Sequence, residues 1–397
     1  MRTPTFTTLF AAAFGLLVSA GWIRSAEPSA ASGGWLMYIG TYTQGSSKGI
    51  YGYTFEAASG EARPIGLVAE TENPSFIAIH PNQHFLYAAN ETSTYKGESA
   101  GSISAFAIDA ASGGLKLLNR VSSRGSGPCH IAIDKTGKWL FVANYDGGSV
   151  AAFQIREDFS LSEATAFVQH QGSSVNRERQ SAPHAHAATP SPDNRFVLVA
   201  DLGLDRIFSY RLDPIVGRLA PATPPFAKLA PGSGPRHLAF RPDGAFVYAI
   251  NEMLSTVTAF RYDSTAGSLQ ESQTISTLPV GYSGENSAAE IAVDAGGRFL
   301  YASNRGHDSI AIFKIDRVKG SLAAVGHAST LGRTPRHFAI DPTGGYLVVA
   351  NQDSGSVVVF RIDPKTGGLT PTGTTLSVPF PVCLAFAAAL PGKKKET

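Results

Sequence analysis

The chain has 397 residues, of which 43% are hydrophobic, and it contains 41 glycines and 24 prolines, a composition that indicates a globular protein. Its 33 lysines and arginines nearly balance 31 acidic residues. The resulting net charge of +2 gives no electrostatic reason to expect nucleic acid or an anionic membrane as a partner.

The first residues have the pattern of an export signal. Arg2 precedes an apolar stretch over residues 9–20, which ends in small residues of the kind that a signal peptidase reads. We expect residues 1–20 to be a cleaved signal peptide and residues 21–34 to be a flexible leader, so that the mature protein is periplasmic or secreted. The alternatives are cleavage after Ala26 and a buried or lipid-anchored N-terminal helix, although the apolar run is short for a membrane span.

From Trp35 onward the sequence repeats with a period of roughly 50 residues. Each unit has an apolar run, a turn such as Asp341–Gly345, a second apolar run that ends in Asn or Asp, and a third that ends in Asp. The complete units begin at Pro74, Pro128, Ala185, Pro235, Ala288 and Pro335. Short β-branched runs such as Phe196–Ala200 are typical of strands, so each unit is interpreted as a four-stranded blade.

The two ends of the chain complete each other. Residues 35–55 contain a second and a third strand but no first, and Pro381–Ala387 has the sequence of a first strand. We therefore predict an all-β fold over residues 35–390, a seven-bladed β-propeller of four-stranded antiparallel blades whose N- and C-terminal strands share one blade. That blade closes the ring and removes an exposed sheet edge. Residues 391–397, which include three lysines, are expected to be a basic tail.

The two cysteines, Cys129 and Cys383, fall in first strands that a whole blade separates, whereas a disulfide needs α-carbons within about 7 Å. We expect both to be buried small side chains, with a reactive thiol as the alternative. No Cys/His spacing resembles a zinc or haem motif, so we expect no metal and no cofactor, and a redox propeller lacks support.

In an antiparallel blade, the start of the first strand and the end of the second lie on the same face of the ring. The residue at the start of the first strand differs from unit to unit, but the next residue is His in three units, at His130, His237 and His337. Such recurrence indicates a shared structural task, for example binding the backbone of a neighbouring blade, with catalysis as the alternative. Residues that vary on a repeated frame offer places for function.

Successive units place four such variable residues on adjacent blades of that face. They are His186 and Arg236 at strand starts, and Glu252 and Arg305 after second strands. Arginine donates in a fork to carboxylate or phosphate, while His or Glu can activate water, so the group suits an anionic substrate with a reacting carbonyl. The alternative is that these residues are rim charges paired in salt bridges.

Eight stretches carry motifs in different blades. They are Tyr38–Thr43, Ser174–Asn176 with Arg179–Gln180, Pro183–His186, Val199–Gly203, Gly234–His237, Ile250–Glu252, Gly284–Ala288 and Tyr301–Gly306. Together they resemble the seven-bladed propeller lactonases, a family that includes bacterial 6-phosphogluconolactonases and fungal carboxy-muconate lactonising enzymes. The resemblance covers about residues 36–386.

The resemblance implies hydrolysis of a sugar lactone at one mouth of the channel, without a tightly required metal. The site of the muconate branch, a His, an Arg, a Glu and an Arg, matches His186, Arg236, Glu252 and Arg305. Glu252 or His186 would activate water. Arg236 would stabilise the oxyanion, and Arg305 would bind the anionic group of the substrate. Candidate substrate-binding residues are His184, which could exchange with His186, and Arg179, His237, Glu285, Glu290, Asn304 and Arg336.

Export would separate the protein from the pentose phosphate pathway, which makes a phosphorylated lactone a less natural substrate than an unphosphorylated aldonolactone or another cyclic ester. A cycloisomerase and a non-enzymatic binding propeller remain alternatives. The loop over residues 170–182 could supply selectivity or be an ordinary polar connection. The sequence is compatible with a monomer or a dimer.

Overall fold

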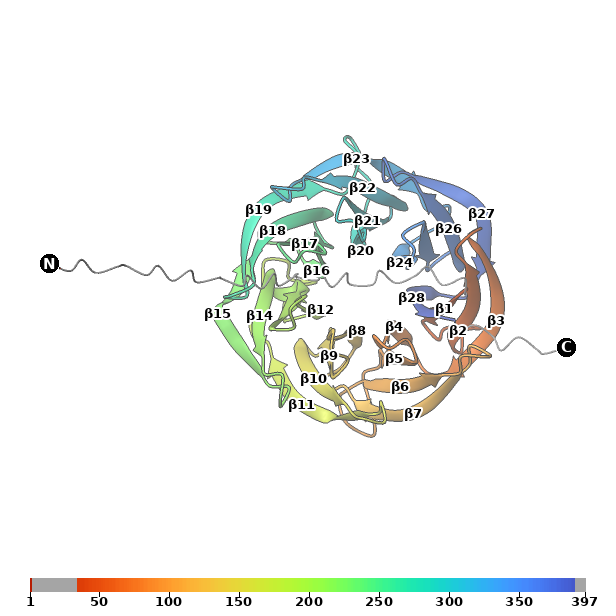
Figure 1. The fold of residues 1–397 in the computed structure, drawn as a ribbon, viewed down its shortest axis with the longest axis horizontal. Helices are drawn as coiled ribbons and strands as arrows, with labels where there is room; N and C mark the ends of the chain where they lie inside the picture. Colours follow the sequence, from red (N-terminus) through yellow and green to blue (C-terminus); the bar gives the residue numbers. More distant parts are fainter. Residues whose placement is uncertain (2–33, 390–397) are drawn as a thin grey trace. The chain divides into compact units, whose positions relative to one another are not determined.

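A computed structural model describes residues 1 and 34–389. Residues 34–389 form seven four-stranded antiparallel sheets around a central axis, which confirms the predicted propeller (Figure 1). In this part of the chain the only helical segment is the 3-10 turn η1 (Leu202–Leu204), and no helix there is long and apolar enough to cross a membrane. The predicted signal peptide apart from Met1, nearly all of the leader and the basic tail lie outside the described residues.

The first three blades in ring order begin with the one that joins the chain ends. Its strands are β28 (Pro381–Ala388), β1 (Trp35–Thr41), β2 (Gly49–Glu56) and β3 (Glu61–Glu70). The next contains β4 (Pro74–Ile79), β5 (Phe85–Asn90), β6 (Ser102–Ile108) and β7 (Leu115–Ser122). The third contains β8 (Pro128–Ile133), β9 (Trp139–Asn144), β10 (Ser149–Ile155) and β11 (Leu161–Gln169).

The other four blades follow in chain order. The fourth contains β12 (Ala185–Pro190), β13 (Phe196–Asp201), β14 (Arg206–Leu212) and β15 (Leu219–Lys228). The fifth contains β16 (Pro235–Phe240), β17 (Phe246–Asn251), β18 (Thr256–Asp263) and β19 (Ser268–Ser276). The sixth contains β20 (Ser287–Val293), β21 (Phe299–Arg305), β22 (Ser309–Ile315) and β23 (Leu322–Ser329). The seventh contains β24 (Pro335–Ile340), β25 (Tyr346–Asn351), β26 (Ser356–Ile362) and β27 (Leu369–Ser377).

The ring closes through the blade that the two chain ends share. Strand β28 pairs antiparallel with β1 from Trp35 opposite Ala388 to Gly40 opposite Cys383. As Figure 1 shows, β28 lies with the other first strands nearest the axis, while the fourth strands form the outer rim. The predicted completion of one end by the other is therefore confirmed, and the strand edge that β1 would otherwise expose is covered.

The core lies between the blades. Strands β9, β13, β17 and β25 are buried at every position, because each second strand is covered by neighbouring blades on both faces. In one of these layers Tyr248 of β17 packs in the same cluster as Leu300 of β21. Outer strands such as β11 alternate between exposed and partly buried residues. Cys129 and Cys383 are free and buried, as expected.

A glycine in the last turn of most blades locks that blade to the one before it. The pairs of glycine and contacted ring are Gly60 with Tyr346, Gly217 with Trp139, Gly267 with Phe196, Gly320 with Phe246, and Gly367 with Phe299. These glycines have φ near +70°, a conformation that L residues rarely adopt. Each contacted ring opens the second strand of the preceding blade, so the turn needs both the backbone freedom and the missing Cβ of glycine.

This lock predicts unequal effects of two Gly→Ala changes. A Cβ at Gly267 would lie 2.3 Å from the Phe196 ring, whereas Gly344, with φ +74°, has no atom within 4 Å of that position. Gly344→Ala should lower the free energy of unfolding by about 1–2 kcal/mol through the backbone alone. Gly267→Ala should lower it by about 1–3 kcal/mol more, because the ring must move. Urea unfolding of both variants checks this, and equal losses would contradict the packing argument.

Candidate functional site

A β-bulge lies near the start of the first strand in every blade. The pairing register shifts there, so that one extra residue interrupts the alternation of the strand. In three blades the extra residue is Cys129, His186 or Arg336, and all three side chains line one cavity. Because a bulge re-aims a side chain without altering the sheet around it, this position can vary while the blade stays constant.

The cavity has a volume of about 310 Å³ and lies on the face where first strands start and second strands end. Its walls come from six of the seven blades and from the loop before β12. The lining residues are Glu91, Cys129, Tyr145, Arg179, His186, Glu252, Ser287, Arg305 and Arg336.

Glu252 is the centre of an arginine cluster on one side of the cavity. Its Oε1 accepts a hydrogen bond of 2.7 Å from Arg179, and its Oε2 lies 2.9 Å from Arg305 Nη2. The same Oε2 lies 3.2 Å from Arg236 Nε, an ion pair whose angle is too poor for a hydrogen bond. Arg236 is buried and does not line the cavity, and it donates instead to the carbonyl of Ala289 at 2.7 Å.

The arginines fix the charge of Glu252. Burial alone would raise its pKa, but Arg305, Arg236 and Arg179 outweigh burial and lower the pKa from 4.5 to about 2. Burial, together with Arg305 and Arg336, lowers the pKa of Arg236 to about 10, which still leaves it protonated at neutral pH. The cluster is therefore a fixed set of charges rather than a titrating group.

A second polar group comes from the closing blade and the two blades beside it. Glu91 follows β5, and both of its carboxylate oxygens lie 3.1 Å from the Tyr42 hydroxyl. The same hydroxyl accepts a hydrogen bond of 2.8 Å from Arg336 Nη2, and the Arg336 guanidinium lies 5.2 Å from the centre of the Tyr42 ring. Glu91 and Arg336 thus reach the cavity from two blades, and Tyr42 of the closing blade joins them.

His186 and His184 have different places although they are two residues apart. His186 lines the cavity, with Nδ1 3.7 Å from Cys129 Sγ, and burial followed by Arg236 lowers its pKa well below the usual range, so it is neutral. His184 stacks on the Tyr145 ring at 4.5 Å between centroids, and its Nδ1 lies 3.0 Å from the Tyr145 carbonyl. The bulge at His186 breaks the shared strand face that made the two appear interchangeable.

The recurring histidines fill the channel near the axis. His130 Nδ1 accepts from the Ala188 amide at 3.4 Å, and His337 Nδ1 accepts from the Leu384 amide at 3.2 Å, so each binds the backbone of the next blade as predicted. His237 differs, because its Nδ1 lies 2.9 Å from Glu290. Burial raises the pKa of Glu290 and lowers that of His237.

The other expected substrate-binding residues lie apart from the cavity lining. Glu285 is exposed on the loop before β20. Asn304 is fully buried, where Nδ2 donates to the Thr277 carbonyl at 2.7 Å and holds that loop. His237 and Glu290 belong to the channel group. Of the expected residues, the cavity brings together His186, Glu252, Arg305, Arg179 and Arg336, with Arg236 directly behind Glu252.

Four lining residues were not named as site residues from the sequence: Glu91, Tyr145, Cys129 and Ser287. Tyr42, whose hydroxyl contacts Glu91 and Arg336, was not named either. Glu91 and Tyr145 follow second strands as Glu252 does, so the same positional rule identifies them. Tyr42 is the equivalent residue after β1, hidden because that blade is divided between the chain ends.

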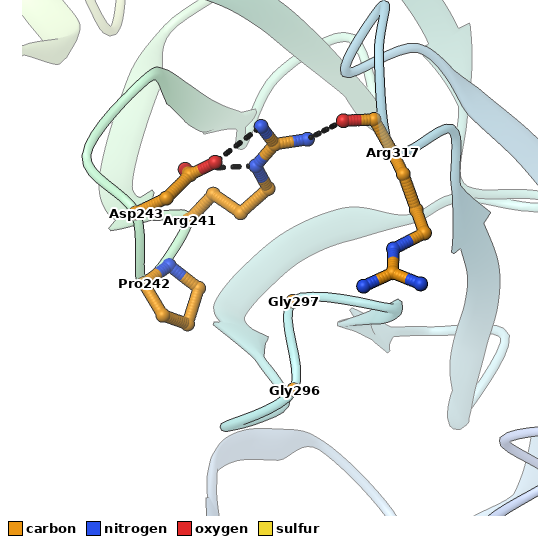
Figure 2. A pocket seen from close by; sticks show the side chains of 6 residues that line it. All are labelled: Arg241, Pro242, Asp243, Gly296, Gly297 and Arg317. Atoms are coloured by element: carbon orange, nitrogen blue, oxygen red, sulfur yellow. Dashed lines mark hydrogen bonds and ion pairs between the residues drawn. The ribbon is translucent and has the colours of Figure 1, made fainter. Parts of the chain in front are cut away.

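Another hollow, of about 290 Å³, lies on the opposite face, among the turns that follow β16, β20 and β22 (Figure 2). Arg241 there is paired with Asp243 through Nε and Nη2 and donates Nη1 to the carbonyl of Arg317 at 3.0 Å. Nε, Nη1 and Nη2 of Arg241 are thus all engaged by the protein. Within residues 34–389 no three His, Cys, Asp or Glu side chains form a group that could hold a metal ion.

Sequence comparisons agree on one family. The family described as "Lactonase, 7-bladed beta-propeller" matches residues 36–386. A 6-phosphogluconolactonase of Bacillus subtilis is 37% identical over 350 residues, which cover 88% of this chain and 97% of the relative. A 6-phosphogluconolactonase of Formosa agariphila is 36% identical over 307 residues, which cover 76% and 85%.

Solved structures give the same picture. The periplasmic gluconolactonase of Pseudomonas aeruginosa superposes with a TM-score of 0.85 at 36% identity, covering 90% of this chain and 100% of that one. A protein from Bacteroides fragilis, provisionally assigned as a 6-phosphogluconolactonase, has a crystal structure that superposes with a TM-score of 0.84 at 40% identity. The match covers 91% of this chain and 100% of that one.

Proposed function

The chain belongs to the seven-bladed β-propeller lactonase family, and from that premise we propose that it hydrolyses a sugar lactone in the cavity at the mouth of its channel. The observation that carries this proposal is the convergence of three arginines and two glutamates from different blades on that one cavity. Hydrolysis of a lactone puts negative charge on the carbonyl oxygen, and fixed guanidinium donors are suited to stabilise it.

Glu252 has the role of an anchor in this proposal. A carboxyl with a pKa of about 2 holds a proton too weakly to serve as an efficient base near neutral pH. Its three ion pairs instead hold Arg179, Arg236 and Arg305 in fixed positions. Such preorganisation lets Arg305 and Arg179 bind an anionic or hydroxyl-rich substrate without a large entropic cost.

His186 has the role of a neutral hydrogen-bonding group. Burial among arginines keeps its ring uncharged, so its contact with substrate adds no further positive charge to the cavity. Tyr145, whose hydroxyl accepts from Arg179 at 3.1 Å, completes this side. Stacking on His184 holds the Tyr145 ring in place.

We infer that the enzyme is exported and acts on an unphosphorylated aldonolactone. The N-terminal residues have the pattern of a signal peptide, and one similar protein is a periplasmic gluconolactonase. The other relatives named above are 6-phosphogluconolactonases, so the phosphorylated lactone is the comparison substrate. Fractionation of expressing cells should find a shortened chain in the periplasm or medium, and a full-length chain in the cytoplasm would contradict export.

Progress curves on gluconolactone and 6-phosphogluconolactone, corrected for spontaneous ring opening, test the proposed function. We expect enzyme-dependent opening of both, with the larger kcat/KM for gluconolactone. No rate above background on either lactone would favour a propeller that only binds a partner. A preference for the phosphorylated lactone would refute the substrate assignment and leave lactone hydrolysis standing.

Arg179→Met should raise KM for the better lactone about 10-fold with little change in kcat, because one charge-assisted contact at the rim is lost. Arg236 and Arg305 remain on Glu252, so the inner site keeps its charges. Arg177→Met is the matched control, since Arg177 is exposed on the same loop and does not line the cavity. Unchanged KM in Arg179→Met would exclude a contact between Arg179 and substrate.

A further inference from the structure

We propose that Glu91 is the base that accepts a proton from the hydrolytic water, and that Arg336 binds the carbonyl oxygen of the lactone. This inference rests on the proposed function and assigns its chemical step. It places the reaction beside the closing blade rather than at Glu252.

The two carboxylates of the cavity differ in how many further hydrogen bonds they can accept. Glu252 is 7% exposed and is surrounded by three guanidinium groups, so its lone pairs are engaged. The Glu91 side chain is half-buried, lines the cavity and accepts one hydroxyl hydrogen from Tyr42. A carboxylate has about four acceptor sites, so Glu91 retains sites for a water molecule.

Arg336 is the lining arginine whose charge is not paired with a carboxylate. In the described part of the chain it donates to the Tyr42 hydroxyl and forms no ion pair with a carboxylate, whereas Arg179 and Arg305 are paired with Glu252. A guanidinium has five N–H donors. Those not used by Tyr42 can meet the oxygen on which charge develops, and Arg336 stands on a bulge that turns its side chain to the cavity.

Tyr42 sets the distance between these two groups. Its hydroxyl donates to Glu91 and accepts from Arg336, so one oxygen fixes both. Burial raises the pKa of Tyr42, and the phenol therefore stays protonated and keeps its donor role. Hydrogen bonds to Asn73 also join the segment after β1, which carries Tyr42, to the segment after β5, which carries Glu91. Thr43 N donates to Asn73 Oδ1 at 2.9 Å, and Glu91 N donates to the Asn73 carbonyl at 2.9 Å.

The step balances with water as the one co-reactant. Water gives a proton to the Glu91 carboxylate as its oxygen bonds to the carbonyl carbon, and the carbonyl π electrons move to the oxygen held by Arg336. When the carbonyl re-forms, the bond to the ring oxygen breaks. The ring oxygen takes the electron pair of that bond and the proton from Glu91. The products are the ring-opened hydroxy acid and the original carboxylate.

Glu91→Gln tests the base directly. We expect kcat for gluconolactone to fall about 100-fold or more, as loss of a general base does, while KM changes by less than about 3-fold. Glu98→Gln is the matched control, because Glu98 is exposed on the same β5–β6 loop and its substitution removes the same charge. This control should leave kcat unchanged. In Glu91→Gly, added formate should restore part of the rate in proportion to its concentration, which a merely structural residue would not allow.

Tyr42→Phe and Arg336→Lys keep the inference testable if changes at Glu91 disturb folding. Tyr42→Phe should lower kcat about 10-fold, because the positioning hydroxyl is lost. Arg336→Lys should lower kcat/KM more than about 10-fold, since the fork is lost but the charge is kept. The unfolding midpoint of each variant should stay near that of the wild type.

The outcomes separate the two proposals. If the wild type opens no lactone above background, the proposed function fails and this inference fails with it. If the wild type is active and a folded Glu91→Gln protein keeps its kcat within about 3-fold, only the inference is overturned. The same holds if formate gives no rescue while His186→Gln abolishes turnover, which would assign the base to His186.

Discussion

Glu252→Gln is expected to abolish most activity and to destabilise the fold by about 3–5 kcal/mol, because it leaves Arg179, Arg236 and Arg305 without their shared counter-charge. Arg236 Nε and Arg305 Nη2 are close to Oε2, and both arginines are largely buried, so solvent cannot replace the carboxylate. Urea unfolding and steady-state kinetics measure the two effects. A folded variant with wild-type kinetics would show that the arginines need no anchor.

The loss should depend on pH in a defined direction. The pKa of Glu252 falls from 4.5 to about 2 on folding, so its ionised form stabilises the native state above pH 4.5. That stabilisation is lost as pH falls through the folded pKa. The difference in unfolding free energy between wild type and Glu252→Gln should therefore be largest above pH 4.5 and shrink toward pH 2. A difference that is constant over this range would contradict the lowered pKa.

Removal of β28 is expected to prevent folding of the whole ring. A chain that ends at Ser377 lacks the strand that pairs with β1 and buries Val382, Cys383 and Leu384, so the closing blade would expose both an edge and its core. We expect loss of the β-sheet circular dichroism signal and aggregation in gel filtration. The matched control ends at Ala389, keeps β28, and should fold as the full chain does. A soluble, cooperative Ser377 truncation would contradict the closure.

The fold was predictable because its signals repeat. The turn residues, the Asn at the end of second strands and the missing first strand of residues 35–55 are all visible in the sequence, and together they specify the closed ring. The family resemblance came from motifs in several blades and is confirmed by the match over residues 36–386. The shared structural task of His130 and His337 was also correctly inferred from recurrence.

The site was predictable in position more than in contacts. Variation on a constant frame led to His186, Glu252 and Arg305, which line the cavity, but the alternation of a regular strand could not reveal the bulges. For that reason His184 and His186 appeared equivalent. The sequence also does not show which arginine meets which carboxylate, because partners from separate blades meet only in the folded ring.

The contrast between Glu91 and Glu252 illustrates this limit. Both follow a second strand, and nothing in their immediate sequence shows that one is enclosed by guanidinium groups and the other is held by a single hydroxyl. That hydroxyl comes from the blade divided between the chain ends. The distinction between an anchoring and a reacting carboxylate therefore depends on ring closure, which links the fold to the proposed chemistry.

A crystal structure with the ring-opened aldonate, at a concentration that inhibits turnover, tests most directly where the reaction occurs. We expect the aldonate in the cavity, with its carboxylate bonded to Arg336 and the chain of hydroxyls directed toward Arg305 and Tyr145. An empty cavity with the ligand bound at the hollow beside Arg241 would contradict the account, because the site would then lie on the opposite face of the propeller (Figure 2).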